Sequence, residues 1–170
     1  MLLVADAYYT SRKVLCPLLG AGHQVLSRVC RNAVAYFPAE AKPPHRRGPQ
    51  PRYGEKVYLM ECFDHPPLFH TAQCHVYGKL EAVQIMSLPL LWKPLGDWLL
   101  FIFAITSRGP IVLMSSDLTL SASTAIELYC VRSRIEIYQP YNLRKTLAVI
   151  TEFRETAAIA WACHATLAAA

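Results

Sequence analysis

Four runs of apolar residues between positions 68 and 116, separated only by short turns, constrain the fold of this chain more than any other feature. The runs read LFHTAQCHVYG, KLEAVQIMSLPLLW, DWLLFIFAI and PIVLMSS. The breaks between them fall at Gly78, at residues 94–96 and at residues 108–110, where glycine and proline favour tight turns. Strands joined by such short turns pair in antiparallel fashion, because a parallel pair needs a longer crossover. The sequence therefore predicts an antiparallel block of four strands.

The first 38 residues follow a different pattern, in which strands alternate with a helix. MLLVAD reads as a buried strand that ends in Asp6, and HQVLSRV at residues 23–29 reads as a second strand. Between them, TSRKVLCPLLGAG predicts a helix over about residues 10–19, with Thr10 or Ser11 as its N-cap. Strand, helix and strand in this order begin an α/β sheet. We therefore predict an α/β fold that carries an inserted antiparallel β block.

Residues 39–56, AEAKPPHRRGPQPRYGEK, are rich in proline and contain two glycines. This composition favours turns over regular elements, so we expect a mobile basic loop. The cations of this loop that are candidates for contacting DNA are Lys42, Arg46, Arg47 and Arg52. Such pieces resemble the minor-groove arms that supply phosphate contacts, and a solvated linker has the same composition. Both interpretations stay open at this point.

The C-terminal part is predicted to be helical. SSDLTLSASTAI reads as a turn that leads into a helix beginning near residues 121–124, with Asp117 stabilising the turn. Thr124 and Glu127 have the spacing of a capping box, and the tail from residue 144 is alanine-rich. The predicted segments are a partial α/β core (1–38), the basic loop (39–56), a β-rich insertion (57–118) and a helical part (119–170).

Charge, cysteines and hydropathy limit the environment of the chain. The net charge of +5 is compatible with an anionic partner, either nucleic acid or a membrane surface. None of the six cysteines forms a C-x-x-C pair and no secretory signal is evident, which indicates free thiols in a reducing cytosol. The longest apolar run, WLLFIFAI, has eight residues, whereas a membrane-spanning helix needs about 20. We therefore predict no membrane span.

The segment ELYCVRSRIE contains an aromatic hydroxyl, a guanidinium and a carboxylate at Tyr129, Arg132 and Glu136. On a helix these positions fall within roughly 60° of one another, so the three polar groups share one face. A solvated face with a weak Arg–Glu pair has this spacing, and so does half of an active site. Spacing alone does not separate the two interpretations.

Asp6 and Glu136 lie at the ends of predicted core elements, and together they are the kind of carboxylate pair that a two-metal phosphoryl-transfer site requires. Mg²⁺ prefers oxygen ligands and keeps several waters, so one or two carboxylates per ion suffice. An arginine one turn before the glutamate is suited to hold a phosphate, and a tyrosine to hydrogen-bond one. The alternative for Asp6 is that it caps the helix at 10–19.

Tyr129, Arg132 and Glu136 match the Y-x2-R-x3-E part of the signature of the DDE transposases of bacterial insertion sequences, and the chain resembles this family over roughly residues 1 to 138. The segments that carry the resemblance, in order, are LLVADAYYTSRKVL, GHQVLSRVCRNAVAYFP, RRGPQPRYGEKV, LLWKPLG, RGPIVLMSSDLTL and AIELYCVRSRIE. An ordered series of this kind is far more specific than the three-residue signature alone.

The resemblance implies an RNase H-like catalytic core with a β-rich insertion before the last acidic residue. It implies that Asp6 is the second catalytic aspartate, that Glu136 is the catalytic glutamate, and that both bind Mg²⁺ or Mn²⁺. The implied activity is metal-dependent nicking and strand transfer of insertion-sequence ends, with Arg132 and Tyr129 contacting DNA phosphate. The implied location is the bacterial cytoplasm, in association with the nucleoid.

The sequence departs from the family pattern at three points, the last of them after Glu136. The first aspartate of the triad is expected upstream of Asp6, and the family lysine that follows the glutamate corresponds to Leu143. Pro140 is also expected to stop or kink the last helix, because its ring clashes with the carbonyl of Glu136. We therefore expect an internal fragment with a frameshifted tail, inactive alone and able to pair with another transposase subunit.

Two other functions stay open. One is a non-catalytic DNA-binding remnant that competes for the element ends. The other is a small zinc-binding module, suggested by the ligand-like spacing of Cys62, His65, His70, Cys74 and His75. Strand alternation argues against the zinc module, since it sends His70 and Cys74 to one face and His75 to the other.

Overall fold

The computed structural model describes residues 1–40 and 49–138, and within these ranges it describes side chains up to residue 132. The chain forms two compact units, Met1–Arg132 and Ser133–Ala170, and each is described by itself. Of the second unit, the structure describes the helical backbone of residues 133–138. The predictions for the centre of the basic loop, for the helix stop at Pro140 and for the alanine-rich tail lie outside the described residues.

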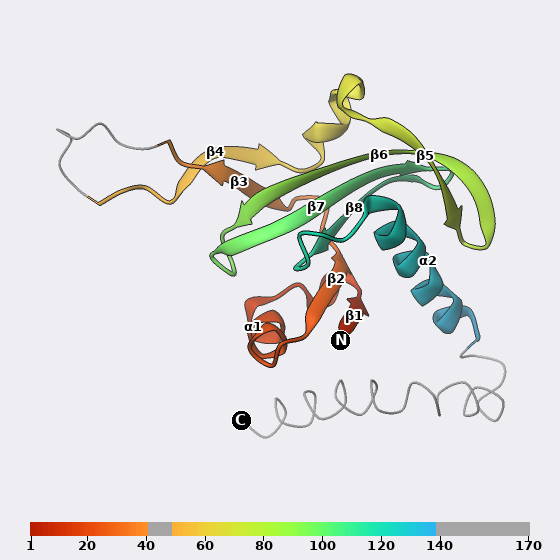
Figure 1. The fold of residues 1–170 in the computed structure, drawn as a ribbon, viewed down its shortest axis with the longest axis horizontal. Coiled ribbons are helices and arrows are strands. Elements are labelled where there is room, and N and C mark those ends of the chain that lie inside the picture. The colour runs from red at the N-terminus through yellow and green to blue at the C-terminus, as the bar shows by residue number, and fades with distance from the viewer. Residues whose placement is uncertain (41–48, 139–170) are drawn as a thin grey trace. The chain divides into compact units, whose positions relative to one another are not determined.

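One mixed sheet of eight strands forms the centre of the first unit (Figure 1). The strands are β1 (Leu2–Ala5), β2 (Gln24–Arg28), β3 (Val34–Pro38), β4 (Tyr53–Tyr58), β5 (His70–Val76), β6 (Lys79–Trp92), β7 (Asp97–Thr106) and β8 (Gly109–Ser115). Their order is β1-β2-β8-β7-β6-β3-β4, and β5 pairs with β6 beside this series. Only β1 and β2 are parallel among these pairs. The chain is therefore a mixed α/β protein with a mostly antiparallel sheet.

The four strands predicted between residues 68 and 116 are confirmed as β5 to β8, and the first two turns lie where glycine and proline indicated. The third turn consists of Ser107 and Arg108, because Gly109 and Pro110 already belong to β8. Between β5 and β6, Val76 pairs with Lys79, so the turn contains only Tyr77 and Gly78. Both turn residues have positive φ, at 50° and 88°, as a two-residue hairpin turn of type I′ requires. The ring of Tyr77 is covered by the guanidinium of Arg108, whose Cζ lies 3.6 Å from the ring centroid.

The strand–helix–strand prediction for the first 38 residues is also confirmed. A short 3-10 helix, η1 (Ala7–Tyr9), and the helix α1 (Arg12–Gly20) connect the parallel strands β1 and β2. Ser11 is the N-cap of α1, and its carbonyl accepts the N–H of Leu15 at 3.0 Å. Leu15 and Leu18 are buried, so α1 is attached to the sheet by its apolar face.

The predicted loop at residues 39–56 is wrong at its C-terminal end. Residues 39–40 and 49–52 have no regular structure, but β4 begins at Tyr53 and pairs with β3, a strand that the sequence analysis missed. The hairpin forms because Val57 pairs with the buried Ala35, and β3 in turn joins β6. Pairing with a neighbouring strand therefore outweighs the turn-forming composition of this region.

The antiparallel strands continue the sheet that β1 and β2 begin. Leu26 of β2 pairs with Ser115 of β8, and Ser27 pairs with Met114. The strands predicted as an inserted block therefore belong to the same hydrogen-bonded sheet as β1 and β2 of the predicted α/β core.

The core of the first unit has two apolar layers, one on each face of the sheet. Phe101 and Phe103 of β7 face one layer, together with Leu15 and Leu18 of α1. Leu100 and Ile102 face the other layer, and the helix α2 (Ala122–Tyr138) packs there. This alternation is the period of two expected of a strand that is buried on both faces. Each fully buried phenylalanine contributes about 1.5–3 kcal/mol.

Asp117 stabilises the turn before α2, as predicted. Its Oδ1 accepts the backbone N–H of Thr119 at 2.9 Å and the Thr119 hydroxyl at 2.7 Å. These hydrogen bonds lower the pKa of the Asp117 carboxyl below its usual value.

In the described part of the chain, no helix combines the length and apolar character needed to cross a bilayer.

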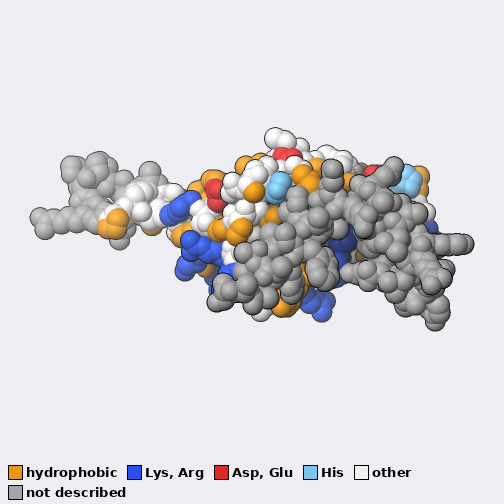
Figure 2. All heavy atoms as spheres, turned by 90° about the horizontal axis from the view of Figure 1, so that it is seen from below, with side chains coloured by type: hydrophobic (Ala, Val, Ile, Leu, Met, Phe, Trp, Pro, Cys, Tyr) orange, Lys and Arg blue, Asp and Glu red, His pale blue; other side chains and the backbone are white. Residues whose placement is uncertain are grey.

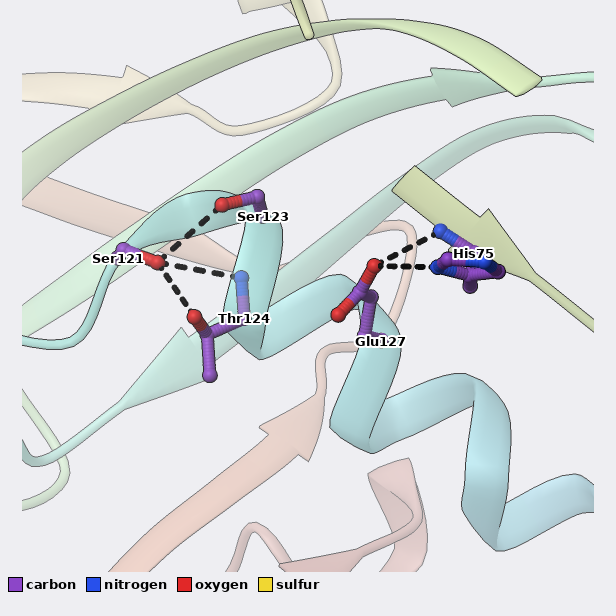
Figure 3. A network of polar contacts seen from close by, with 5 residues as sticks. All are labelled: His75, Ser121, Ser123, Thr124 and Glu127. Atoms are coloured by element: carbon purple, nitrogen blue, oxygen red, sulfur yellow. Dashed lines mark hydrogen bonds and ion pairs between the residues drawn. The ribbon is translucent and has the colours of Figure 1, made fainter. Parts of the chain in front are cut away.

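The predicted capping box at the start of α2 is wrong. Ser121 is the residue that caps the helix: its Oγ accepts the N–H of Thr124 at 3.2 Å and contacts the Thr124 hydroxyl at 2.6 Å (Figure 3). The carboxylate of Glu127 points instead toward β5, where it accepts the backbone N–H of His75 at 2.9 Å. The serine precedes the helix by one residue, in the usual N-cap position.

Candidate functional site

Asp6 lies immediately after β1, at the carboxyl ends of the two parallel strands. Its Oδ1 accepts the N–H of Ala7 at 2.8 Å, and its own carbonyl accepts the hydroxyl of Ser27 at 2.9 Å. The carboxylate therefore caps the 3-10 helix η1, whereas the alternative drawn from the sequence had it capping the helix at 10–19. Anchored at its side chain and its backbone, Asp6 has a defined position at this edge of the sheet.

Arg132 of α2 forms an ion pair with Asp6, although the two residues are 126 positions apart in the sequence. Nη2 of Arg132 lies 3.2 Å from Oδ2 of Asp6. The arginine side chain is 20% exposed and the aspartate side chain 46% exposed. The fold thus unites the end of β1 with the third turn of α2, which are the two places where the sequence analysis located functional residues.

Tyr129 lies one turn before Arg132 and is only 6% exposed. The Cζ of Arg132 lies 5.5 Å from its ring centroid, within the range of a cation–π contact. Burial raises the pKa of the Tyr129 phenol, and the negative charge of Asp6 raises it further, while Arg132 and Arg28 oppose this effect. The alternative of a solvated helix face is therefore wrong for Tyr129 and for most of Arg132.

Cations dominate the segment around Asp6. Asp6 is the only carboxylate among residues 1–39, and the same residues contain four exposed cations: Arg12, Lys13, Arg28 and Arg31. Arg28 is close enough to affect the ionisation of Tyr129. On the face that Figure 2 presents, Lys and Arg side chains lie among hydrophobic ones beside the residues drawn in grey. Such a mixture is suited to an anionic partner with apolar parts.

The other predicted site residues are only partly described. Glu136 lies on α2 four residues after Arg132, but it belongs to the second unit and its side chain is outside the described side chains. Lys42, Arg46 and Arg47 lie outside the described residues. Arg52 is described, and it is exposed just before β4. The distance from Asp6 to Glu136 therefore stays a prediction.

The donors for the predicted Mg²⁺ or Mn²⁺ ion are present in part. Asp6 supplies carboxylate oxygens of the kind that Mg²⁺ prefers, and both of them contact protein groups, the N–H of Ala7 and the guanidinium of Arg132. Among the described residues, no three His, Cys, Asp or Glu side chains form a group able to hold a metal. A complete ligand set would need at least the carboxylate of Glu136.

The five residues that suggested a zinc module do not converge on a metal site in the described ranges. Cys74 is fully buried, and burial raises the pKa of its thiol. His75 points the other way and contacts Glu127 through its ring Nδ1 at 3.1 Å. Cys62 donates its thiol to the carbonyl of Tyr58 at 3.8 Å. Because Cys62, Cys74 and His75 each have a partner or an environment of their own, the described residues give the zinc interpretation no support.

The contact between His75 and Glu127 positions α2, and the sequence analysis missed it. The single oxygen Oε1 of Glu127 accepts both the backbone N–H and the ring of His75 (Figure 3). These hydrogen bonds lower the pKa of the Glu127 carboxyl, the backbone bond having the larger effect. The contact attaches β5 to the helix two residues before Tyr129. No local sequence signal marks it, since both residues are partly exposed and 52 positions apart.

Comparison with models of known protein families gives no match to this chain. A comparison with curated proteins gives no significant match either. The candidate site therefore stands on its residues and their geometry.

Proposed function

We propose that this chain belongs to a DDE transposase of the insertion-sequence type and binds DNA through an RNase H-like core. In this proposal β1, α1, β2 and α2 belong to the core, and Arg132 and Tyr129 contact a DNA phosphate beside Asp6. One observation carries the proposal: Arg132 and Asp6, which are 126 positions apart in the sequence, form an ion pair at 3.2 Å.

The exposure of the Asp6–Arg132 pair is what makes phosphate binding feasible. An ion pair near the surface contributes only about 0–1 kcal/mol, because water competes for both charges. A phosphate accepts strong, bidentate hydrogen bonds from a guanidinium, so it can compete with the carboxylate of Asp6 for Arg132. Tyr129, held under the guanidinium, restricts the directions in which Arg132 can point. The four cations of residues 1–39 add attraction for the rest of the DNA backbone.

A divalent cation is part of this proposal, with Asp6 and Glu136 as its ligands. When bound, Mg²⁺ or Mn²⁺ would neutralise charge on the phosphate and activate the attacking oxygen. Asp6 and Glu136 would supply carboxylate oxygens to this ion, and Arg132 would contact the DNA phosphate beside them. The same proposal implies a location with the DNA in the bacterial cytoplasm, alone or together with another transposase subunit, and no membrane association.

A non-catalytic DNA-binding role is the second candidate, and a specific observation favours it. Both oxygens of the Asp6 carboxylate already contact protein groups, and the described residues contain no group of three metal-binding side chains. A protein of this kind would occupy element ends without cutting them.

The test is an assay of binding and nicking on labelled duplex DNA that carries the ends of the flanking insertion sequence, with Mg²⁺ or Mn²⁺. Nicking that is lost in Glu136→Gln would assign a metal-dependent nuclease. Binding without nicking would assign the non-catalytic role. A chain that binds no DNA at low salt would contradict both forms of the proposal.

A further inference from the structure

Two adjacent tyrosines lie on the surface directly after Asp6. Tyr8 is 87% exposed and Tyr9 is 45% exposed, and their rings meet edge to face with centroids 5.5 Å apart. A tyrosine in contact with water over most of its ring makes little contribution to the fold. Neither ring is needed to build the site around Asp6 that is described above.

The segment that carries these rings is held in a fixed shape. The N–H of Tyr9 donates to the carbonyl of Asp6 at 3.0 Å, and the hydroxyl of Thr10 donates to the carbonyl of Ala7 at 2.7 Å. The Asp6 carboxylate caps the same turn at the N–H of Ala7. A ligand therefore meets aromatic faces on an ordered turn, and little backbone entropy is lost on binding.

The charges around the turn indicate what kind of ligand fits. Arg12 and Lys13 follow it in the first turn of α1, and both are exposed. Arg28 follows Ser27, whose hydroxyl donates to the carbonyl of Asp6 at the start of the turn. Exposed aromatic rings beside a cationic surface are the combination that binds single-stranded nucleic acid: bases stack on the rings and phosphates contact the cations.

We propose that Tyr8, supported by Tyr9, is a stacking platform for an unpaired base of a DNA strand whose phosphates lie on the neighbouring arginines and lysine. The inference rests on the proposed function and deepens it, because it assigns the substrate class as DNA with an unpaired base next to the phosphate at Arg132. A duplex with all its bases paired has no base free to stack on Tyr8, so the platform distinguishes distorted or single-stranded DNA from intact duplex.

The experiment measures the affinity of the full chain and of its variants for a labelled single-stranded oligonucleotide and for the duplex of the same sequence. The expected result is that Tyr8→Ala weakens single-strand binding by about tenfold, whereas Tyr8→Phe and Tyr8→Trp retain it. Duplex binding is expected to change by less than about twofold, since it depends on phosphate contacts. Because Tyr8 is exposed, these variants are expected to fold, and circular dichroism checks this.

A second readout reports stacking directly. An oligonucleotide with 2-aminopurine at one position loses fluorescence when that base stacks on an aromatic ring, and Tyr8→Ala is expected to restore the fluorescence at saturating protein. The control is Tyr58→Ala, which removes an exposed tyrosine from β4 and is expected to have no effect.

The same measurements distinguish an incorrect role for Tyr8 from an incorrect assignment of DNA binding. If Tyr8→Ala binds the single strand as the unmodified chain does, while Arg132→Ala weakens it, the platform is wrong and the DNA-binding proposal stands. If the unmodified chain binds neither form of DNA, both the proposed function and the stacking role of Tyr8 are wrong.

Discussion

At the scale of single residues, the candidate site consists of groups whose environments differ sharply within a short distance. Tyr129 is buried, Arg132 is mostly covered, and Asp6 is about half exposed. Burial fixes the tyrosine, and the tyrosine ring in turn restricts the guanidinium. The aspartate stays accessible to water and to a competing ligand. Exposure to solvent therefore increases from Tyr129 through Arg132 to Asp6. An ion pair that a ligand can displace needs such an arrangement, with a fixed cation and an anion that solvent can reach.

The burial of Tyr129 leads to a prediction about stability. Tyr129→Ala is expected to lower the free energy of unfolding by about 3–5 kcal/mol, because it removes a buried aromatic ring from the layer between α2 and the sheet. Tyr129→Phe keeps the ring and is expected to cost less than about 1.5 kcal/mol. Urea denaturation of the two variants checks this, and equal, small losses would indicate that the residue lies on a solvated face.

The ionisation of Tyr129 gives a second prediction at this scale. Its pKa is raised above the usual value near 10, so the neutral phenol is favoured in the folded state. The corresponding stability is fully present below pH 10 and is lost as the pH rises through the raised value. In an alkaline titration followed by phenolate absorbance, a late-ionising fraction is expected that Tyr129→Phe removes. If Tyr129→Phe removes absorbance from the early part of the curve, the burial is wrong.

At the scale of elements, α2 is positioned by contacts on two sides. Its apolar residues Ala125 and Ile126 pack on the sheet, and Glu127 is attached to β5 through His75. The helix begins at the cap provided by Ser121. The direction of α2, and with it the place where Arg132 meets Asp6, follows from these contacts.

The cap at Ser121 predicts a measurable loss. Ser121→Ala is expected to lower the free energy of unfolding by about 1 kcal/mol, because the N–H of Thr124 loses its acceptor. Ser121→Asp keeps an acceptor at the N-cap and serves as the matched control, with stability close to that of the unmodified chain. Thermal or urea unfolding is the measurement. An unchanged midpoint in Ser121→Ala would show that α2 is capped in another way.

The contact between β5 and α2 predicts a dependence on pH. The pKa of Glu127 is lowered from 4.5 in the folded state, first by the hydrogen bond from the backbone N–H of His75. The stability it provides is therefore present above pH 4.5 and is lost as the pH falls through the lowered value. Glu127→Gln is expected to be less stable near pH 6, with a gap that closes toward pH 3. Urea midpoints at several pH values measure this, and a gap independent of pH would contradict it.

At the scale of the whole molecule, local signals in the sequence predict most of the elements but not how they join. Alternation and turn residues indicate β5 to β8, and a strand–helix–strand pattern indicates β1, α1 and β2. The hairpin of β3 and β4 was missed because the prolines and glycines of this region favour turns, whereas Ala35 pairs with Val57 and β3 pairs with the distant strand β6. Nothing local indicates that β2 pairs with β8.

In the candidate site, too, some contacts follow from spacing along the sequence, and others depend on how distant segments fold together. Helical spacing alone joins Tyr129 and Arg132, but the contact of Arg132 with Asp6 depends on the sheet whose strands lie between them in the sequence. The partners of His75, Cys62 and Glu127 depend on the position of side chains in three dimensions, which spacing along the chain does not give.

The most direct test of the contact between Arg132 and a DNA phosphate is the salt dependence of DNA binding by the unmodified chain, Arg132→Ala and Lys79→Ala. Lys79 is an exposed cation after the β5–β6 turn, so Lys79→Ala removes the same charge at another place. We expect Arg132→Ala to bind a labelled duplex about tenfold more weakly, with a salt slope smaller by about one, while Lys79→Ala changes affinity by less than about twofold. Equal effects of the two variants, or binding that does not respond to salt, would show that Arg132 makes no such contact.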